Sequence, residues 1–280
     1  MQARELGATG AEVPLIGQGT WNLERDFRAE AIAALRRGLD AGMTHIDTAE
    51  LYGDGRVEEL VRDALGHRRN EAFLASKVAP DHATFEGTLQ ACERSLKRLG
   101  TDHLDLYLLH WPGPHPLEQT LAAFERLVEQ GKTRFWGVSN FDPWQLEQAV
   151  RLAGEGHVAC NQVLYHLGER HVESALFPLC ARHRIAVVAY SPFGAGGFPS
   201  PRTEGGRALH EIADARGVSP RAVALAFLTR SDGLFAIPKA SSVGHVLENA
   251  RAGELRLTER EVAQIDQAFP LEVRESLPML

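Results

Sequence analysis

Apolar and polar positions along this chain alternate between two patterns. Short apolar runs that are typical of buried strands begin, for the most part, roughly 25 to 31 residues apart, the length of one strand–helix unit. Between them apolar residues recur three and four positions apart, as Ala31, Ala34, Leu35 and Leu39 do, which indicates helices. The predicted strands are residues 15–19, 44–48, 73–77, 104–110, 134–139, 159–164, 185–190 and 234–238. The predicted helices are residues 27–41, 86–99, 117–130, 144–152, 173–182, 206–216, 220–229, 243–252 and 258–268.

This alternation predicts an α/β fold with a parallel sheet. Strand runs such as Leu-Asp-Leu-Tyr-Leu-Leu at 104–109 are largely apolar, as expected where helices cover the sheet. Eight units favour closure into a (β/α)8 TIM barrel, a single domain over residues 1–280, with an open doubly wound sheet as the alternative. Residues 3–6 and 12–13 flank a Gly- and Thr-containing turn and predict a β-hairpin at the barrel bottom. The Gly- and Pro-rich residues 191–205 predict a mobile loop.

Composition narrows the class of partner. The net charge is -7 and no block of Lys or Arg occurs, which argues against nucleic acid and anionic membranes. No apolar run approaches the roughly 18 residues of a membrane span, and the polar N-terminus does not resemble a signal peptide. The three cysteines form no C-x-x-C pair, which favours a reducing compartment. We therefore expect a cytoplasmic protein.

Polar residues end several of the apolar runs, where barrel enzymes carry their active sites. Asp47, Lys77 and His110 end the second, third and fourth predicted strands, and Tyr52 follows in the loop after Asp47. Singly, each has an ordinary structural explanation, such as a surface charge, a loop aromatic or a packed histidine. Together the four groups have complementary chemistry. Lys⁺ lowers the pKa of a nearby tyrosine, and Asp holds the lysine in place. A neutral His can donate a hydrogen bond to a substrate carbonyl. The set predicts a general acid that protonates a developing alkoxide.

Such a reaction needs a hydride from a cofactor, because no side chain supplies one. No G-x-G-x-x-G lies between a predicted strand and helix, so a Rossmann site is absent from the pattern. Gly131-Lys132-Thr133 lacks the earlier glycine of a P-loop, since Arg126 stands there. A metal-dependent barrel hydrolase is disfavoured because no H-x-H follows the first strand, and we expect no metal.

Several short motifs carry a resemblance to a known family. They are, in order, Asp47-Thr48-Ala49, Tyr52-Gly53, Ser76-Lys77-Val78, Asp105-Leu106-Tyr107-Leu108-Leu109-His110-Trp111-Pro112, Gly137-Val138-Ser139-Asn140-Phe141, Asn161-Gln162, Ala189-Tyr190-Ser191-Pro192 and Ile237-Pro238-Lys239. In order and spacing these motifs resemble the aldo-keto reductases, from about residue 4 to residue 270. Within the family, Gly17-Gln18-Gly19-Thr20-Trp21 and residues 161–168 resemble bacterial methylglyoxal reductases.

The resemblance implies roles for individual residues. Asp47, Tyr52, Lys77 and His110 match the catalytic tetrad. Residues 139–140 and 162 would bind the carboxamide of a nicotinamide, and residue 190 would stack on its ring. Residues 191–194 would line the pyrophosphate. Residues 239–242 would bind the 2′-phosphate, and residues 248–249 would contact adenine. The full set of implied cofactor residues is Gly19, Thr20, Asp47, Ser139, Asn140, Gln162, Tyr190, Ser191, Pro192, Phe193, Gly194, Ile237, Lys239, Ser241, Ser242, His245, Glu248 and Asn249. His245 stands where the family often has an arginine, so NADPH is favoured and NADH remains open.

The resemblance also implies a substrate class. An open pocket built from Trp21, Tyr52, His110 and Trp111 is expected to accept small or varied aldehydes, with methylglyoxal first. For the two tryptophans the alternative is core packing. A competing hypothesis is a non-catalytic, nicotinamide-binding redox-sensing subunit like the potassium-channel β subunits, against which the complete tetrad argues. We expect a monomer that acts on a small-molecule carbonyl compound.

Overall fold

The fold is built on a parallel sheet whose strands follow each other in chain order. The computed structural model describes residues 1–272 and 277–279. The strands are β3 (Gln18–Gly19), β4 (His45–Asp47), β5 (Phe73–Val78), β6 (Leu104–Leu109), β7 (Thr133–Ser139), β8 (Val158–Leu164), β9 (Ala186–Tyr190) and β10 (Leu234–Ala236). Six of these eight strands are buried at every position, and β9 is buried except at its last residue, Tyr190, because helices pack on the outer face.

The sheet curls until its first and last strands lie side by side. Gly17 N donates to Ala236 O at 2.8 Å, and Ala236 N donates to Leu15 O at 2.9 Å. Gly19 N reaches Pro238 O at 3.1 Å. The predicted first strand, 15–19, is therefore too long: β3 keeps only Gln18–Gly19, because upstream of it only an isolated bridge joins Ile16 to Ala236.

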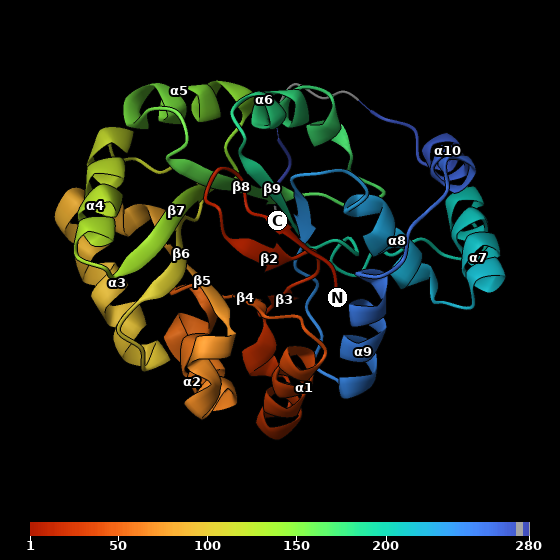
Figure 1. Ribbon diagram of the computed structural model, residues 1–280, viewed down its shortest axis with the longest axis horizontal. Helices are drawn as coiled ribbons and strands as arrows, with labels where there is room; N and C mark the ends of the chain where they lie inside the picture. The colour runs from red at the N-terminus through yellow and green to blue at the C-terminus, as the bar shows by residue number, and fades with distance from the viewer. Residues whose placement is uncertain (273–276, 280) are drawn as a thin grey trace.

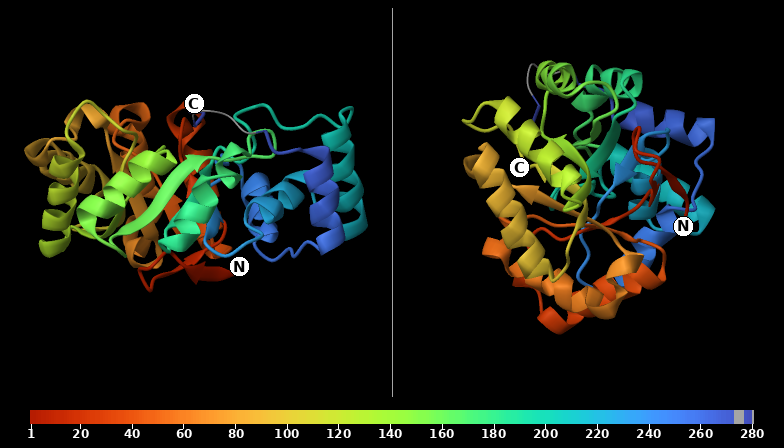
Figure 2. Two further views of the ribbon diagram at one scale, coloured as in Figure 1. Left: turned by 90° about the horizontal axis from the view of Figure 1, so that it is seen from above. Right: turned by 60° about the vertical axis from the view of Figure 1, so that its left-hand side comes forward.

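Helices surround the curled sheet (Figure 1). They are α1 (Arg28–Asp40), α2 (Arg56–Leu65), α3 (Phe85–Leu99), α4 (Leu117–Glu129), α5 (Pro143–Ala153), α6 (Leu176–Arg182), α7 (Glu204–Arg216), α8 (Pro220–Leu228), α9 (Val243–Ala252) and α10 (Glu259–Ala268). Both views in Figure 2 and that in Figure 1 place α7 and α10 together at the outside. None of the helices in residues 1–272 has the length and apolarity needed to span a lipid bilayer.

One helix, α2, was not predicted. Its buried face is regular, with Val57, Leu60, Val61 and Ala64 at helical spacing, so the apolar period was present in the sequence. Its start is what the usual signals miss: the N-cap is Gly55, in the left-handed conformation and with no side-chain cap. The helix follows directly on the 3-10 turn that holds Tyr52.

The predicted hairpin is present at the amino-terminal ends of the strands. β1 (Ala3–Glu5) and β2 (Glu12–Pro14) pair antiparallel, and in Figure 1 they cross the middle of the sheet in red. Gly7 (φ +61°) lies so close to the start of β8 that a Cβ there would stand 2.3 Å from Ala159 O. A glycine is therefore required where the hairpin approaches the sheet.

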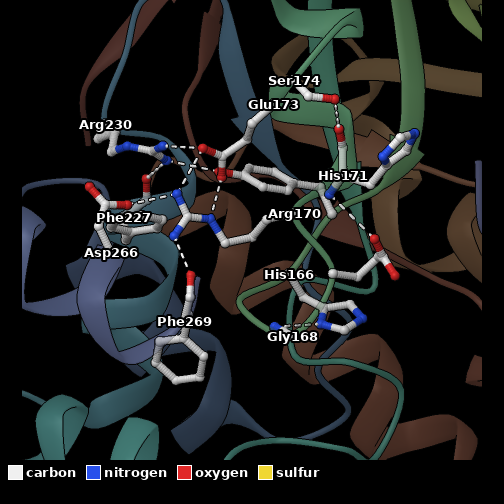
Figure 3. A network of polar contacts seen from close by, with 12 residues as sticks. His166, Gly168, Arg170, His171, Glu173, Ser174, Phe227, Arg230, Asp266 and Phe269 are labelled. Carbon is white, nitrogen blue, oxygen red and sulfur yellow. Dashed lines mark hydrogen bonds and ion pairs between the residues drawn. The ribbon is translucent and has the colours of Figure 1, made fainter. Parts of the chain in front are cut away.

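A cluster of ion pairs fixes the segment after β8 (Figure 3). Glu173 Oε1 lies 2.7 Å from Arg170 Nε, and Glu173 Oε2 lies 2.8 Å from Arg230 Nη2 at the end of α8. Arg170 Nη2 also reaches Asp266 Oδ1 on α10 at 2.7 Å. We call these residues, with Tyr165, the Glu173 cluster. Glu173 lies in a 3-10 turn, so the helix predicted from residue 173 begins only at Leu176.

Candidate active site

A cavity of about 260 Å³ opens at the carboxyl ends of the strands. Strand-end and loop residues from most of the sheet line it: Gly19, Thr20, Trp21, Asp47, Leu51, Tyr52, His110, Trp111, Ser139, Asn140, Gln162, Tyr190, Ser191, Ile237 and Lys239. All of these except Leu51 are among the residues predicted from the sequence. The parallel strands bring them together because their carboxyl ends share one rim.

Lys77 holds three predicted residues in one contact network. Its side chain is fully buried at the end of β5, and its Nζ lies 2.5 Å from Asp47 Oδ1. The same Nζ donates to Thr48 O at 2.8 Å and reaches the Tyr52 hydroxyl at 3.1 Å. These contacts use the three N–H donors of the ammonium group, so the buried charge is fully hydrogen-bonded.

Asp47 is held from two further sides. Gln162 Nε2 donates to its second oxygen, Oδ2, at 2.7 Å, although the two residues lie 115 positions apart. Thr20 Oγ1 donates to the backbone carbonyl of Asp47 at 2.8 Å. The carboxylate is therefore oriented between Lys77 and Gln162, a contact that the sequence alone did not indicate.

The pKa shifts of Tyr52 and Lys77 differ in part from the prediction. Burial raises the pKa of Tyr52, and the attraction of Lys77 lowers it only in part, so the net shift is upward. The sequence-based expectation that Lys77 brings the pKa below its ordinary value is thus wrong in its net direction, because the cavity wall desolvates the phenolate. Burial also disfavours the charge of Lys77, but Asp47 and Tyr52 outweigh it and raise the pKa of that lysine. At neutral pH the tyrosine is protonated and the lysine is charged.

His110 packs against Tyr52 in the cavity wall. Their rings meet edge to face, with centroids 5.6 Å apart at 70°. Burial and then Lys77 lower the pKa of His110 to about 2, so the imidazole is neutral at neutral pH. Its Nδ1 is buried without a hydrogen-bond partner among the described residues. A neutral ring of this kind can donate one hydrogen bond without adding charge.

The opposite wall carries polar groups that already bond to each other. Tyr190 donates from its hydroxyl to Asn140 Oδ1 at 2.9 Å, and Asn140 Nδ2 donates to His110 O at 3.1 Å. Ser139 Oγ donates to Gln162 O at 2.8 Å. The wall therefore combines an aromatic face with oriented amide and hydroxyl groups.

The mouth of the cavity is apolar. Trp21 and Trp111 are 44% and 37% exposed, so they belong to the cavity wall, and the core-packing alternative is wrong. Leu51, 41% exposed, joins them and was missed. The signal that could have found it was its position directly before Tyr52.

The remaining predicted residues lie at the edge of this cavity or outside it. Lys239 lines its edge and forms an ion pair with Asp26, while Ser242 caps α9 by accepting from His245 N at 3.4 Å. His245 is exposed, and Asn249 is buried with its Nδ2 unpartnered among the described residues. The predicted residues that do not line the cavity are Lys77, which lies behind Asp47 and Tyr52, Pro192, Phe193 and Gly194 in the loop after β9, and Ser241, Ser242, His245, Glu248 and Asn249 at and within α9.

The sequence model of the Aldo/keto reductase family matches residues 15–269, and the chain belongs to this family. It is therefore an oxidoreductase. Among characterised relatives, methylglyoxal reductase YeaE of Escherichia coli (strain K12) is 44% identical over 273 residues, covering 96% of each chain. Glyoxal reductase of Bacillus subtilis (strain 168) is 33% identical, over 92% of this chain and 89% of its own.

Solved structures of relatives share the whole fold. An aldo/keto reductase from Klebsiella pneumoniae, in complex with NADP and acetate, is 43% identical and covers both chains completely with a TM-score of 0.93. A second structure from the same organism, in complex with NADPH, gives a TM-score of 0.92 at the same identity and coverage.

Proposed function

We propose that this protein reduces aldehydes and ketones to alcohols with NADPH, on a closed (β/α)8 barrel, with Tyr52 as the general acid. The observation that carries the proposal is the Tyr52 hydroxyl, 3.1 Å from the charged Lys77 and facing neutral His110 in a cavity of about 260 Å³. Barrel closure is supported by the backbone hydrogen bonds that join residues 15–19 to residues 236–238.

The residues present fit a nicotinamide dinucleotide. Tyr190 offers a flat aromatic face, and Ser139, Asn140 and Gln162 offer the donors and acceptors that a carboxamide needs. Asn249 adds a buried amide nitrogen, without a partner among the described residues, at the position that the family resemblance assigns to adenine. The Klebsiella relatives bind NADP and NADPH, which supports NADPH here. When bound, this cofactor supplies the hydride.

The protein's own groups then handle the substrate oxygen. A carbonyl oxygen in the cavity would accept hydrogen bonds from Tyr52 and from His110, which polarise the carbonyl group and orient it. As negative charge develops on this oxygen, the proton moves to it from the Tyr52 hydroxyl, and Lys77 stabilises the phenolate that remains. Asp47 keeps the Lys77 ammonium in place.

Methylglyoxal is the substrate that we propose first. Two relatives reduce small dicarbonyl compounds by name, methylglyoxal and glyoxal. The apolar side chains of Trp21, Leu51 and Trp111 in the cavity wall suit an uncharged aldehyde. We further propose that the protein acts as a monomer in the cytoplasm, a setting that its buried free thiols Cys92, Cys160 and Cys180 support.

The test is a screen of NADPH oxidation with methylglyoxal, glyoxal, aromatic aldehydes and bulky ketones, using the wild-type protein and Tyr52→Phe. We expect turnover of the small aldehydes by wild type and its near loss in the variant, while NADPH binding measured by fluorescence is kept. Turnover restricted to bulky ketones would overturn the substrate proposal. Full activity of the variant would overturn the role of Tyr52.

A further inference from the structure

The segment that carries Tyr52 is irregular, although the hydroxyl must lie within hydrogen-bond distance of Lys77. It leaves β4 at Asp47 and runs to a turn in which Gly53 and Asp54 both have left-handed backbones, with φ of 56° and 54°. Lys77, by contrast, is set by the ladder of β5. Some contact must therefore fix the distance from the irregular segment to the regular strand.

Few groups in the segment supply that contact. Leu51 is exposed at the cavity mouth, and the Thr48 hydroxyl is buried without a partner among the described residues. The backbone bond from Glu50 N to Lys77 O is long, at 3.4 Å. The start of the segment is tied to β5, because Thr48 N donates to Ala75 O at 3.0 Å and Lys77 Nζ donates to Thr48 O at 2.8 Å. Closer to Tyr52, the side chain of Glu50 is the group that reaches the chain just beyond Lys77.

Glu50 makes a dense set of contacts with the residues just after Lys77. The residue is 8% exposed, and its Oε1 accepts from Ala79 N at 2.8 Å and lies 2.9 Å from His82 Nδ1. Its Oε2 lies 3.3 Å from Arg94 Nη2 on α3. Ala79 follows Lys77 by two residues, so one carboxylate ties the Tyr52 segment to the end of the Lys77 strand.

We infer that Glu50 is a positioning residue, which sets the Tyr52 hydroxyl at its working distance from Lys77 through the hydrogen bond that it accepts from Ala79 N–H. The inference rests on the proposed function of Tyr52 as the proton donor. Glu50 does not line the cavity and does not touch the reacting atoms. Its effect is on the geometry and the titration of Tyr52.

The chain offers a matched control in Glu58. This carboxylate is also buried, at 0% exposure, and also pairs with an arginine and a neutral donor. Its Oε2 lies 2.5 Å from Arg98 Nε, and its Oε1 accepts from Ser76 Oγ at 2.7 Å. Those contacts join α2, α3 and the outer face of β5, and none of them reaches residues 48–52 or 78–82.

The experiment compares Glu50→Ala, Glu50→Gln and Glu58→Ala in the full-length chain. We expect Glu50→Ala to lower kcat about tenfold to a hundredfold, the order of effect when a reacting group is displaced by about 1 Å. NADPH affinity should stay within about twofold, because the cofactor groups are untouched. Glu50→Gln keeps an oxygen acceptor for Ala79 N–H and should recover most of kcat. Glu58→Ala should lose thermal stability comparably while kcat changes little.

A second measurement does not depend on turnover. The ultraviolet titration of wild type minus that of Tyr52→Phe isolates the ionisation of Tyr52 among the four tyrosines. In Glu50→Ala this ionisation should move to higher pH, because the phenolate loses part of the stabilisation by Lys77. In Glu58→Ala it should stay as in wild type.

The outcomes distinguish the positioning role of Glu50 from the proposed function of Tyr52. Equal losses of kcat in Glu50→Ala and Glu58→Ala, or an unmoved Tyr52 titration in Glu50→Ala, would overturn the positioning role. Should Glu50→Ala fail to fold, a Glu50→Gln variant that loses kcat as strongly as Tyr52→Phe would overturn it also, since the Ala79 bond is kept. Turnover that persists in Tyr52→Phe contradicts the proposed function instead, and the titration still decides the role of Glu50.

Discussion

The Lys77 cluster (Asp47, Tyr52, Lys77) and the Glu173 cluster are built from the same kinds of group: a tyrosine, a cation and a carboxylate. In the Glu173 cluster the hydroxyl of Tyr165 donates to Glu173 Oε1 at 2.7 Å and accepts from Arg230 Nη1 at 2.8 Å. In the Lys77 cluster the Tyr52 hydroxyl has one hydrogen-bond partner among the described residues, Lys77 Nζ at 3.1 Å.

This difference in hydrogen bonding distinguishes a structural tyrosine from a tyrosine that can donate its proton to a substrate. Tyr165 is fully buried and its proton is already engaged within the protein. Tyr52 is half-buried, lines the cavity, and has its proton free to face a substrate. Burial raises the pKa of both tyrosines, and a neighbouring cation offsets part of the shift in each. An upward pKa shift alone therefore does not identify a catalytic tyrosine, whereas an unused donor at a cavity wall does.

The largest expected effect comes from removing one hydroxyl at a time. Tyr52→Phe should lower kcat by about 10²- to 10⁴-fold, the usual contribution of a general acid. Tyr165→Phe should leave kcat within a factor of about two and lower the free energy of unfolding by about 1–3 kcal/mol, because Glu173 and Arg230 each lose a partner. Steady-state kinetics and urea unfolding of both variants measure the contrast. Comparable kinetic losses in the two would contradict the comparison.

Next in size is the removal of the carboxylate that organises the Glu173 cluster. Glu173→Ala should lower the free energy of unfolding by about 3–5 kcal/mol, because it leaves the guanidinium groups of Arg170 and Arg230 without their shared partner. Activity per folded molecule should be kept at low temperature. Thermal unfolding measures the loss of stability, and steady-state kinetics below the unfolding transition measure the activity of the folded variant. A loss of kcat in a variant that stays folded would show that the cluster has a catalytic role.

The pH dependence of the reduction rate should distinguish the proton donor, Tyr52, from the neutral hydrogen-bond donor, His110. His110 has its pKa lowered to about 2, so it stays neutral and the rate should show no inflection near the ordinary histidine pKa of about 6.5. The rate should fall only on the alkaline side, as Tyr52 loses its proton above the ordinary tyrosine pKa of about 10. An inflection near pH 6.5 that disappears in His110→Gln would mean that the imidazole titrates in the working range.

The smallest expected effect is on cofactor preference. Asp26 pairs with Lys239 at the edge of the cavity, and both side chains are about one-third exposed. Because exposed pairs contribute about 0.2–1 kcal/mol, Asp26→Asn should tighten NADPH binding by up to about fivefold and leave NADH binding unchanged. His245→Arg should act in the same direction by adding a bidentate phosphate donor. Fluorescence titration with both cofactors measures this, and equal tightening of NADPH and NADH would refute a 2′-phosphate origin.

Much of the architecture was readable from the sequence. The two periods in the apolar pattern placed the parallel strands to within one to three residues at their ends, because buried strands and amphipathic helices leave different spacings. The ends of the predicted strands alone placed Asp47, Lys77 and His110 on one rim. The exceptions, α2 and the start of α6, lie where a glycine cap or an ion-paired turn replaces the usual helix-start residues.

Residue types and their order along the chain determined which groups share the rim and what chemistry they are able to perform. Only the tertiary structure decided how those groups meet: that Gln162 reaches Asp47 over 115 positions, that Glu50 reaches Ala79, and that burial outweighs Lys77 in the pKa of Tyr52. The physical reason is that hydrogen-bond distances and desolvation depend on how closely distant segments pack, and the local pattern of residues does not encode that packing.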